Sequence, residues 1–580
     1  MIKYNISAYG APRSPEYGTE CEVRVRLQSG WACGVHRVAD NCTHFFSFLG
    51  VPYAAQPIGE RRFRELEPVE PWNDFYDATY ERPICPQYDV LYGRLQESHQ
   101  MNEACIYANI HVPLKALPVY RVRPPALVPQ PPHQAGLSEN ENDPGLPILV
   151  FIHGGGFAFG SGGIGLHGPE FLMRKDVIVI TFNYRLNVFG FLSLNSSSIP
   201  GNNGLRDVVT LLQWVQVNAK SFGGDPNNVT LAGQSAGASI AHLISMSKAA
   251  DGLFQRVILM SGTGLPNFFT SSPAYAELVA NSFLSNLGIN ATDPEDIHRQ
   301  LIATPIEDIM ESNKLLQEYF GLVVFAPVVE TPFPGVTTIL DEDPEILMAK
   351  GCGINIPMLV GFTNAECETF RHNFEKFDIL SRLKENPLLM LSPSLIFKLP
   401  PKNALDLAQK VNKRYFDGVP TLDKYIKSCS DAYYIYPAIK FAKIRASMKG
   451  APVFLYQYSY EADFSVIKES MDLDYKGAGH IEDMTFIFRA NAMEDVKGFS
   501  PPTQQDKLMA NWMTTFVKDF IDCNDPTCNK HYVSSWPPVD YHMTVQYQNI
   551  EMPKFYHFTE LTEEQQDMVQ FFDSLQNRIS

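Results

Sequence analysis

Short runs of apolar, mostly β-branched residues recur along the chain and constrain its fold more than any other feature. These runs are Ile148–Ile152, Val177–Ile180, Val229–Ala232, Val257–Met260, Met358–Val360 and Val453–Tyr456. Continuous apolar runs of this length are typical of strands that are buried on both faces. Between two of them, the segment 205–215 places its leucines and valines on one face at helical spacing. The alternation predicts an α/β fold with a large, mostly parallel central sheet flanked by helices.

The chain of 580 residues has no internal repeat and no linker that divides it into equal parts. Its strongest change of composition is the proline-rich segment 117–147, which we expect to be a long surface loop. Residues 378–448 carry several helical patterns, which indicates a helical insertion packed on the main body. We therefore predict an N-terminal extension (1–20), one large α/β domain (21–565) and a C-terminal tail (566–580).

The net charge of −17 argues against nucleic acid as a partner, because an acidic surface repels phosphate. No apolar run reaches the length of about 20 residues that spans a bilayer. The first residues lack the apolar core of a secretory signal, which favours a cytoplasmic location. Secretion is the alternative, because glycosylation sequons begin at Asn5, Asn41, Asn195, Asn228 and Asn290.

The chain also has ten cysteines, and two pairs of them are close enough in sequence to close small loops. These pairs are Cys85 with Cys105 and Cys523 with Cys528. Disulfides form in oxidising compartments, whereas free thiols are usual in a cytosolic enzyme. The sequence alone leaves both readings open.

Ser235 stands in the segment Gly233-Gln-Ser-Ala-Gly237, between an apolar strand-like run and an apolar helix-like run. A strand, a sharp turn and a helix are what a nucleophile elbow requires, and the glycines relieve crowding at the strained serine. The alternative is a plain tight turn with a surface serine. The context favours the nucleophile, with its hydroxyl at a helix N-terminus at the edge of the sheet.

The segment His153-Gly-Gly-Gly-Phe157 directly follows the run Ile148–Ile152, where an α/β-hydrolase carries half of its oxyanion hole. Glycines let the backbone approach a substrate closely and present N–H groups to a developing negative charge. We expect the N–H donors to be those of Gly155, Gly156 and Ala236. His153 itself is expected to be structural.

A catalytic base and an acid must follow the serine in this fold, in the order serine, acid, histidine. His480 lies in the glycine-rich segment 476–483, which suits a loop that presents a base, whereas His242 is expected to face the core. For the acid, Glu366 follows a predicted strand, and Glu368 and Asp341 are rivals. Spacing alone does not choose among the three.

The chain resembles the type-B carboxylesterase and cholinesterase family from about residue 21 to residue 553. The resemblance is carried by the elbow and by Phe48-Leu-Gly-Val-Pro-Tyr53, Arg62-Phe63, Gly201-Asn-Asn-Gly-Leu-Arg-Asp207 and Phe222-Gly-Gly-Asp-Pro226. It implies a triad of Ser235, Glu366 and His480, with Glu366 in Val360-Gly-Phe-Thr-Asn-Ala-Glu and His480 in Gly477-Ala-Gly-His. It also implies a disulfide between Cys85 and Cys105 and a salt bridge between Arg62 and Glu103.

Within the family the chain is similar to insect esterases. Gln234, where most members carry Glu, and the segment from Gly477 to Asp483 resemble juvenile hormone esterases, although other insect carboxylesterases share the glutamine. Val208 and Thr263 depart from the patterns of hormone esterases and cholinesterases, respectively. The choline-binding tryptophan is not identifiable, which argues against acetylcholine as substrate.

We therefore expect a serine carboxylesterase that hydrolyses apolar carboxylic esters through an acyl-enzyme, without a metal or cofactor. The resemblance implies an insect esterase for xenobiotic, odorant or hormone esters. The first alternative is a juvenile hormone esterase, and the second is a non-catalytic ligand-sequestering or adhesion protein on the same fold. The aromatic residues Phe157, Phe159 and Phe320 are candidates for the substrate pocket. The sequence does not reveal the acyl and alcohol preference or the oligomeric state.

Overall fold

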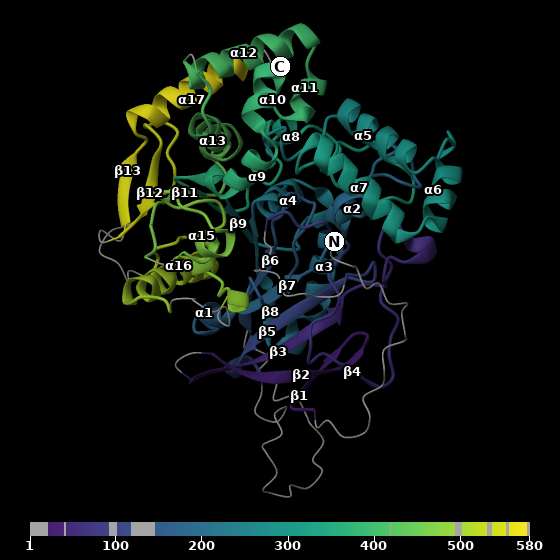
Figure 1. Ribbon diagram of the computed structural model, residues 1–580. Helices are drawn as coiled ribbons and strands as arrows, with labels where there is room; N and C mark the ends of the chain where they lie inside the picture. Colours follow the sequence, from purple (N-terminus) through teal and green to yellow (C-terminus); the bar gives the residue numbers. More distant parts are fainter. Residues whose placement is uncertain are drawn as a thin grey trace, which may run out of the picture.

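The computed structural model describes residues 21–39, 42–91, 101–117, 145–417, 419–463, 465–493, 501–529, 536–552 and 556–576. Within these residues one sheet of 13 strands forms the centre of the molecule (Figure 1). Its order is β1-β2-β3-β5-β7-β6-β8-β9-β10-β11-β12-β13, and β4 pairs with β2. The strands are β1 (Val23–Leu27), β2 (Gly30–Ala39), β3 (Thr43–Pro52), β4 (Phe75–Asp77), β5 (Tyr107–Pro113), β6 (Leu146–Ile152), β7 (Ile178–Phe182), β8 (Gly224–Gln234), β9 (Arg256–Met260), β10 (Met358–Thr363), β11 (Val453–Tyr458), β12 (Gln546–Ile550) and β13 (Tyr556–Glu560).

The centre of the sheet, from β7 to β12, is parallel throughout. Every apolar run singled out in the sequence forms one of these parallel strands, as predicted. The flanking strands pair antiparallel, from β1 to β7 on one side and between β12 and β13 on the other, except for β4, which pairs parallel with β2. The carboxyl ends of the parallel strands therefore lie along one edge, where α/β proteins place their sites.

The helices are α1 (Glu170–Met173), α2 (Asn187–Phe191), α3 (Asn203–Asn218), α4 (Ala236–Ser245), α5 (Pro273–Asn286), α6 (Pro294–Ala303), α7 (Ile306–Phe320), α8 (Pro344–Ala349), α9 (Arg371–Lys376), α10 (Ile379–Glu385), α11 (Pro393–Lys398), α12 (Pro401–Phe416), α13 (Leu422–Ser430), α14 (Tyr436–Ser447), α15 (Val466–Met471), α16 (Gln504–Cys523) and α17 (Glu563–Gln576). None of the helices in the described ranges combines the length and the hydropathy needed to cross a membrane.

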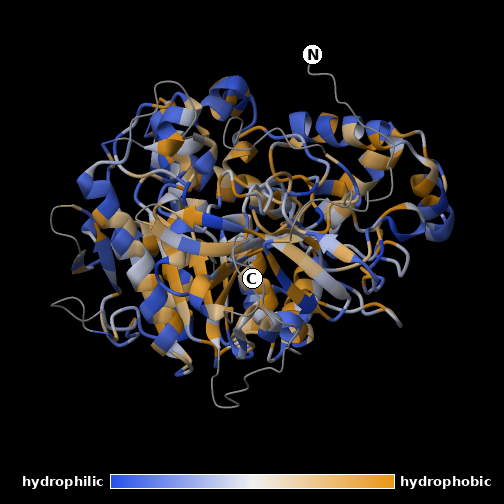
Figure 2. Ribbon diagram, turned by 90° about the horizontal axis from the view of Figure 1, so that it is seen from below, coloured by the Kyte–Doolittle hydropathy of each residue, from blue (hydrophilic) through white to orange (hydrophobic). Residues whose placement is uncertain are grey.

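Both faces of the sheet are covered, because successive side chains of a strand point to opposite faces. In β6, Val150 packs in one apolar cluster with residues of α3 and α4, whereas Phe151 packs in another with residues of α16. Apolar colouring is concentrated in the central strands and polar colouring in the outer helices (Figure 2). A continuous apolar strand is the expected result of burial on both sides.

The predicted helical insertion is present as α10 to α14, and α10 to α13 lie with α17 in the upper part of Figure 1. The predicted boundary between residues 565 and 566 falls inside α17, which packs on α14 through stacked rings of Tyr436 and Phe572. The proline-rich segment 117–147 and the extension 1–20 lie almost entirely outside the described residues, although β6 already begins at Leu146.

Candidate active site

Ser235 lies in a sharp turn between the end of β8 and the start of α4. Its backbone has φ 57° and ψ −124°, a strained conformation that costs about 1–3 kcal/mol and persists only where its surroundings enforce it. The turn is too tight for larger neighbours, since a Cβ on Gly233 would lie 2.3 Å from the backbone of Gly237. A Cβ on Gly237 would lie 2.2 Å from the carbonyl oxygen of Ile152. The glycines of the motif thus allow the elbow that the sequence predicts.

His480 lies on a loop and Glu366, 114 residues away, begins the short 3-10 helix Glu366–Phe370; the two form a buried pair. His480 Nδ1 lies 2.6 Å from Glu366 Oε2, and the other carboxylate oxygen accepts a 2.8 Å hydrogen bond from the Thr363 N–H. The His480 backbone N–H also donates to the Glu366 carbonyl oxygen at 3.0 Å. Because the carboxylate accepts at Nδ1, the neutral ring carries its proton there and presents Nε2 as a base.

The rival carboxylates lie elsewhere. Glu368 forms an ion pair with Arg371 at 2.8 Å, and Asp341 is exposed. Their positions leave Glu366 as the carboxylate that contacts the imidazole. The residue next to the serine contacts the imidazole as well, since Gln234 Nε2 lies 3.1 Å from His480 Nε2.

Ser235 and His480 line one narrow cavity, which we call the catalytic cavity. Its volume is only about 10 Å³, enough for one water molecule. The rest of its lining is two glycines of the segment after β6 and a set of mostly apolar side chains: Leu91, Gly155, Gly156, Phe159, Phe268, Phe269, Leu322, Phe370, Tyr434 and Ile481. An apolar lining around a single polar centre suits apolar esters.

The glycine segment after β6 reaches this cavity with Gly155 and Gly156. Both have positive φ, 110° and 60° respectively, and a Cβ on Gly155 would lie 2.0 Å from the Phe159 carbonyl oxygen. Side chains are therefore excluded where the predicted donors stand. Ala236, the third predicted donor, is the first residue of α4 and follows the serine directly. A helix N-terminus adds a favourable dipole for an oxyanion.

The loop that carries His480 is held by two buried carboxylates that the sequence showed only as part of a motif. Glu482 accepts hydrogen bonds from the Tyr475 hydroxyl at 2.9 Å, from Ser465 and from the Gly479 N–H. Asp483 accepts one from the Tyr456 hydroxyl at 2.8 Å. Burial, together with the nearby Glu366 carboxylate, raises the pKa of Asp483 to about 6.

Two further histidines are structural, as expected. His242 is buried on α4, accepts the Gly264 N–H at 2.9 Å, and has a pKa that burial lowers to about 3. His153 stacks on Tyr184, and burial lowers its pKa to about 4. Both rings are therefore neutral near pH 7, and neither lies against Ser235 in the catalytic cavity.

Of the three aromatic candidates, Phe159 lines the catalytic cavity. Phe157 packs on Phe191 and Phe269, and Phe320 packs on Tyr275, so neither forms part of the lining. Phe268, Phe269, Phe370 and Tyr434 line the cavity and were missed, because no local pattern distinguishes them from core aromatics.

The structure pairs Cys85 with Cys105, and Arg62 forms a bidentate ion pair with Glu103 at 2.7 and 2.5 Å. Both features brace the loop that leads to Leu91 in the catalytic cavity. The further disulfides in the described residues are Cys21–Cys33, Cys367–Cys429 and Cys523–Cys528. Within the same residues no group of three or more His, Cys, Asp or Glu side chains is arranged to hold a metal ion.

Comparisons with known proteins show the family of the chain. The family model described as "Carboxylesterase family" matches residues 22–569. The chain is 52% identical to the juvenile hormone esterase of Heliothis virescens, covering 96% of this chain and 94% of that protein. It is 30% identical to esterase FE4 of Myzus persicae, covering 89% of this chain and 86% of that protein.

A crystal structure of juvenile hormone esterase from Manduca sexta, with OTFP covalently attached, is 51% identical. It superimposes with a TM-score of 0.88 over 96% of this chain and all of that one. PNB esterase, at 26% identity, covers 94% of this chain and 100% of that one, with a TM-score of 0.71. From its matched sequence, its sheet and its neighbours, the chain belongs to the carboxylesterase family and is a carboxylic ester hydrolase of the α/β-hydrolase fold.

Proposed function

We propose that Ser235 is the nucleophile of this esterase, His480 its general base and Glu366 the residue that orients the base. The observation that carries the proposal is the buried 2.6 Å contact between Glu366 and His480 Nδ1, beside a cavity that His480 and Ser235 both line. Only 6% of the surface of Ser235 is exposed to solvent, so the reaction takes place away from bulk water. Such shielding strengthens every electrostatic interaction in the site.

In the first half of the reaction, Ser235 Oγ attacks the ester carbonyl carbon while His480 Nε2 accepts the serine proton. The carbonyl oxygen becomes an oxyanion, which the N–H groups of Gly155, Gly156 and Ala236 stabilise. His480 then donates its proton to the departing alcohol, leaving an acyl group on Ser235. In the second half His480 activates water, which releases the acid and restores the serine. Glu366 holds the tautomer and stabilises the imidazolium in both halves.

For the natural substrate we favour juvenile hormone. The support is the 52% identity to the Heliothis virescens enzyme and the 51% identity to the Manduca sexta structure, each over nearly the whole chain. A general esterase for xenobiotic or odorant esters is the second candidate, because the apolar lining of the catalytic cavity suits many apolar esters and does not single out one of them.

We also propose that the protein functions in an oxidising compartment, as a secreted enzyme. Among the described residues, eight cysteines form four disulfides. Disulfides form in oxidising compartments, contrary to the cytoplasmic location expected from the first residues. Cys42 and Cys352 are the free thiols among the described residues. Asn195 and Asn290 are exposed, as glycosylation requires, whereas Asn5 and Asn41 lie outside the described residues.

Hydrolysis of p-nitrophenyl acetate by the parent protein and by Ser235→Ala tests the nucleophile. We expect kcat to fall by about 10⁴-fold or more, with an organophosphate labelling the parent and not the variant. Ser239→Ala, one turn further along α4, is the matched control and should retain the parent activity. Equal turnover in parent and Ser235→Ala would refute the role of Ser235, and no turnover in the parent would favour a ligand-sequestering protein.

The substrate is tested by comparing kcat/KM for juvenile hormone with kcat/KM for p-nitrophenyl acetate in the same preparation. A hormone esterase should show a much higher kcat/KM for the hormone, whereas a general esterase should favour the activated acetate. Both enzymes depend on Ser235, so the comparison separates the substrate from the chemistry.

A further inference from the structure

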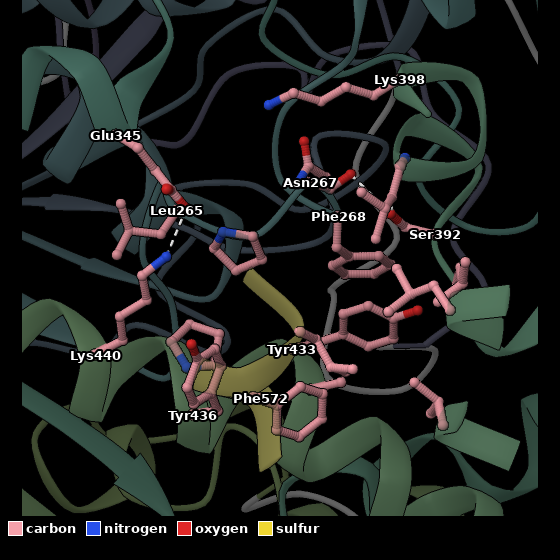
Figure 3. A pocket seen from close by; sticks show the side chains of 18 of the residues that line it. Leu265, Asn267, Phe268, Glu345, Ser392, Lys398, Tyr433, Tyr436, Lys440 and Phe572 are labelled. Carbon is pink, nitrogen blue, oxygen red and sulfur yellow. Dashed lines mark hydrogen bonds and ion pairs between the residues drawn. The ribbon is translucent and has the colours of Figure 1, made fainter. Parts of the chain in front are cut away.

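A second, larger cavity, drawn in Figure 3, shares the side chain of Phe268 with the catalytic cavity. Its volume is about 620 Å³, and its walls come from α8, α11, α12, α14 and α17 and from the loop that carries Phe268. Most of the lining is apolar, including Met390, Leu391, Leu395, Leu407, Val411 and Phe572. A cavity of this size and lining is in the range that binds a drug-sized apolar molecule.

One side chain, Phe268, lines both cavities. Its ring stacks on Tyr433 with centroids 4.7 Å apart, and Figure 3 shows the two rings side by side at the cavity wall. Tyr433 lines the second cavity, and the next residue, Tyr434, lines the catalytic cavity 4.6 Å from the His480 ring. The partition between the two spaces is therefore a single layer of aromatic rings.

Tyr433 and Tyr434 belong to a π-helical turn, Asp431–Ile435, between α13 and α14. Such turns are rare and are frequent at functional sites, because the wider turn changes the directions of neighbouring side chains. Here consecutive tyrosines line different cavities. Phe268 is half-buried, and its ring borders the empty space of the second cavity, into which it can rotate.

The charges at the second cavity are paired with each other. Lys440 Nζ lies 2.7 Å from Glu345, and Lys398 Nζ lies 2.8 Å from Asp343. Figure 3 shows the lysines at the edges of the cavity, apart from the apolar rings. Ammonium groups neutralised in this way offer little to an anionic ligand, so the lining favours a neutral apolar chain.

We propose that the second cavity is a subsite for the long apolar chain of an ester whose carbonyl lies at Ser235, reached when Phe268 and Tyr433 rotate apart. This proposal rests on the proposed function and adds where the long chain of the ester binds and that this chain is apolar. The catalytic cavity has room for little more than the reacting atoms, whereas the second has the volume that a long chain needs. Each methylene buried there should raise kcat/KM by about two- to fourfold.

The test is a chain-length series of p-nitrophenyl esters, from acetate to decanoate, and a matching series of alkyl acetates. Leu395→Trp fills the second cavity from α11, away from Ser235 and His480. Leu405→Trp adds the same ring to an exposed position of α12 that does not line the cavity and is the matched control. Ile346→Trp, at a half-exposed position of the lining, is a second filling variant that should fold if Leu395→Trp does not.

We expect both filling variants to lower kcat/KM for the long ester of one series by about tenfold or more and to leave the acetate unchanged. Leu405→Trp should behave as the parent, and Phe268→Ala should raise the ratio of long to short ester. If the filling variants keep the parent ratios in both series, the subsite is refuted while the esterase stands. If the parent fails to hydrolyse even the acetate, the proposed function itself is refuted.

Discussion

A Glu366→Gln substitution replaces one buried carboxylate oxygen by an amide NH₂ and leaves the side-chain volume nearly unchanged. Two groups then compete for the remaining oxygen: the Thr363 N–H, now 2.8 Å from Oε1, and His480 Nδ1, now 2.6 Å from Oε2. If the oxygen stays with Thr363, the NH₂ faces Nδ1 and moves the ring proton to Nε2. That tautomer has no lone pair with which to accept the serine proton.

The opposite amide orientation keeps the tautomer but places the NH₂ against the Thr363 N–H. A buried donor left without an acceptor costs about 1–3 kcal/mol, which lowers the competent population by about 5- to 150-fold. The loss of the carboxylate charge beside the imidazolium removes a charge-assisted hydrogen bond, worth about 1.5–3 kcal/mol. Together the two effects predict a loss of about 10²- to 10⁴-fold in kcat.

The assay is kcat for p-nitrophenyl acetate near neutral pH, with thermal unfolding as a check on folding. Glu368→Gln is the matched control, since its carboxylate pairs with Arg371 rather than with the imidazole, and we expect close to parent activity. A Glu366→Gln enzyme within tenfold of the parent would refute the reasoning. So would an equal loss in the two variants, which would point to general damage to the loop.

Three further predictions follow from the surroundings of the triad. Gln234→Glu places a carboxylate beside His480 Nε2 and stabilises the imidazolium that forms during the reaction, so kcat/KM for p-nitrophenyl acetate should rise; an unchanged kcat/KM would contradict the 3.1 Å contact. Asp483 has a pKa raised from 3.8 to about 6, so the native state binds more protons than the unfolded state in this range. Its contribution to stability is therefore present below pH 3.8 and lost as the pH rises to about 6, an effect of about 3 kcal/mol that Asp483→Asn should abolish. Parallel curves of unfolding free energy against pH for parent and variant would count against it. Arg62→Met leaves a buried carboxylate unpaired and should lower the unfolding free energy by about 3–5 kcal/mol in urea titrations, whereas Arg61→Met, at an exposed pair, should cost about 0–1 kcal/mol.

The parts of the fold that could be predicted are those with strong local patterns. A strand buried on both faces is mostly apolar, so Val229–Ala232, in which only Thr230 is polar, predicts a central strand from sequence alone. The elbow was equally local, because Gly233 and Gly237 are required within a few residues of Ser235 by contacts of the same turn. Patterns of this kind depend on neighbours along the chain and are visible without tertiary contacts.

The acid and the pocket lining depend on contacts between distant segments. Glu366 and Glu368 have similar local surroundings in the sequence, and the structure separates them because one meets His480 while the other meets Arg371. Phe268 lines the cavity, yet nothing near it in the sequence differs from a core aromatic. Resemblance to a family supplied the acid, but it carried no information on the aromatic partition.

The helical insertion, α10 to α14, contacts both the triad residues and the second cavity. Cys367, next to Glu366, is disulfide-bonded to Cys429 of α13, and its N–H donates to the Ser430 hydroxyl at 2.9 Å. The π-helical turn that begins at the next residue carries Tyr434 against the His480 ring and Tyr433 against Phe268. Because the same short segment anchors the acid, contacts the base and closes the second cavity, substitutions that widen the cavity should be tolerated best on α11 and α12. Those on the tyrosine turn should alter substrate range and turnover together, since there the two properties share their supporting contacts.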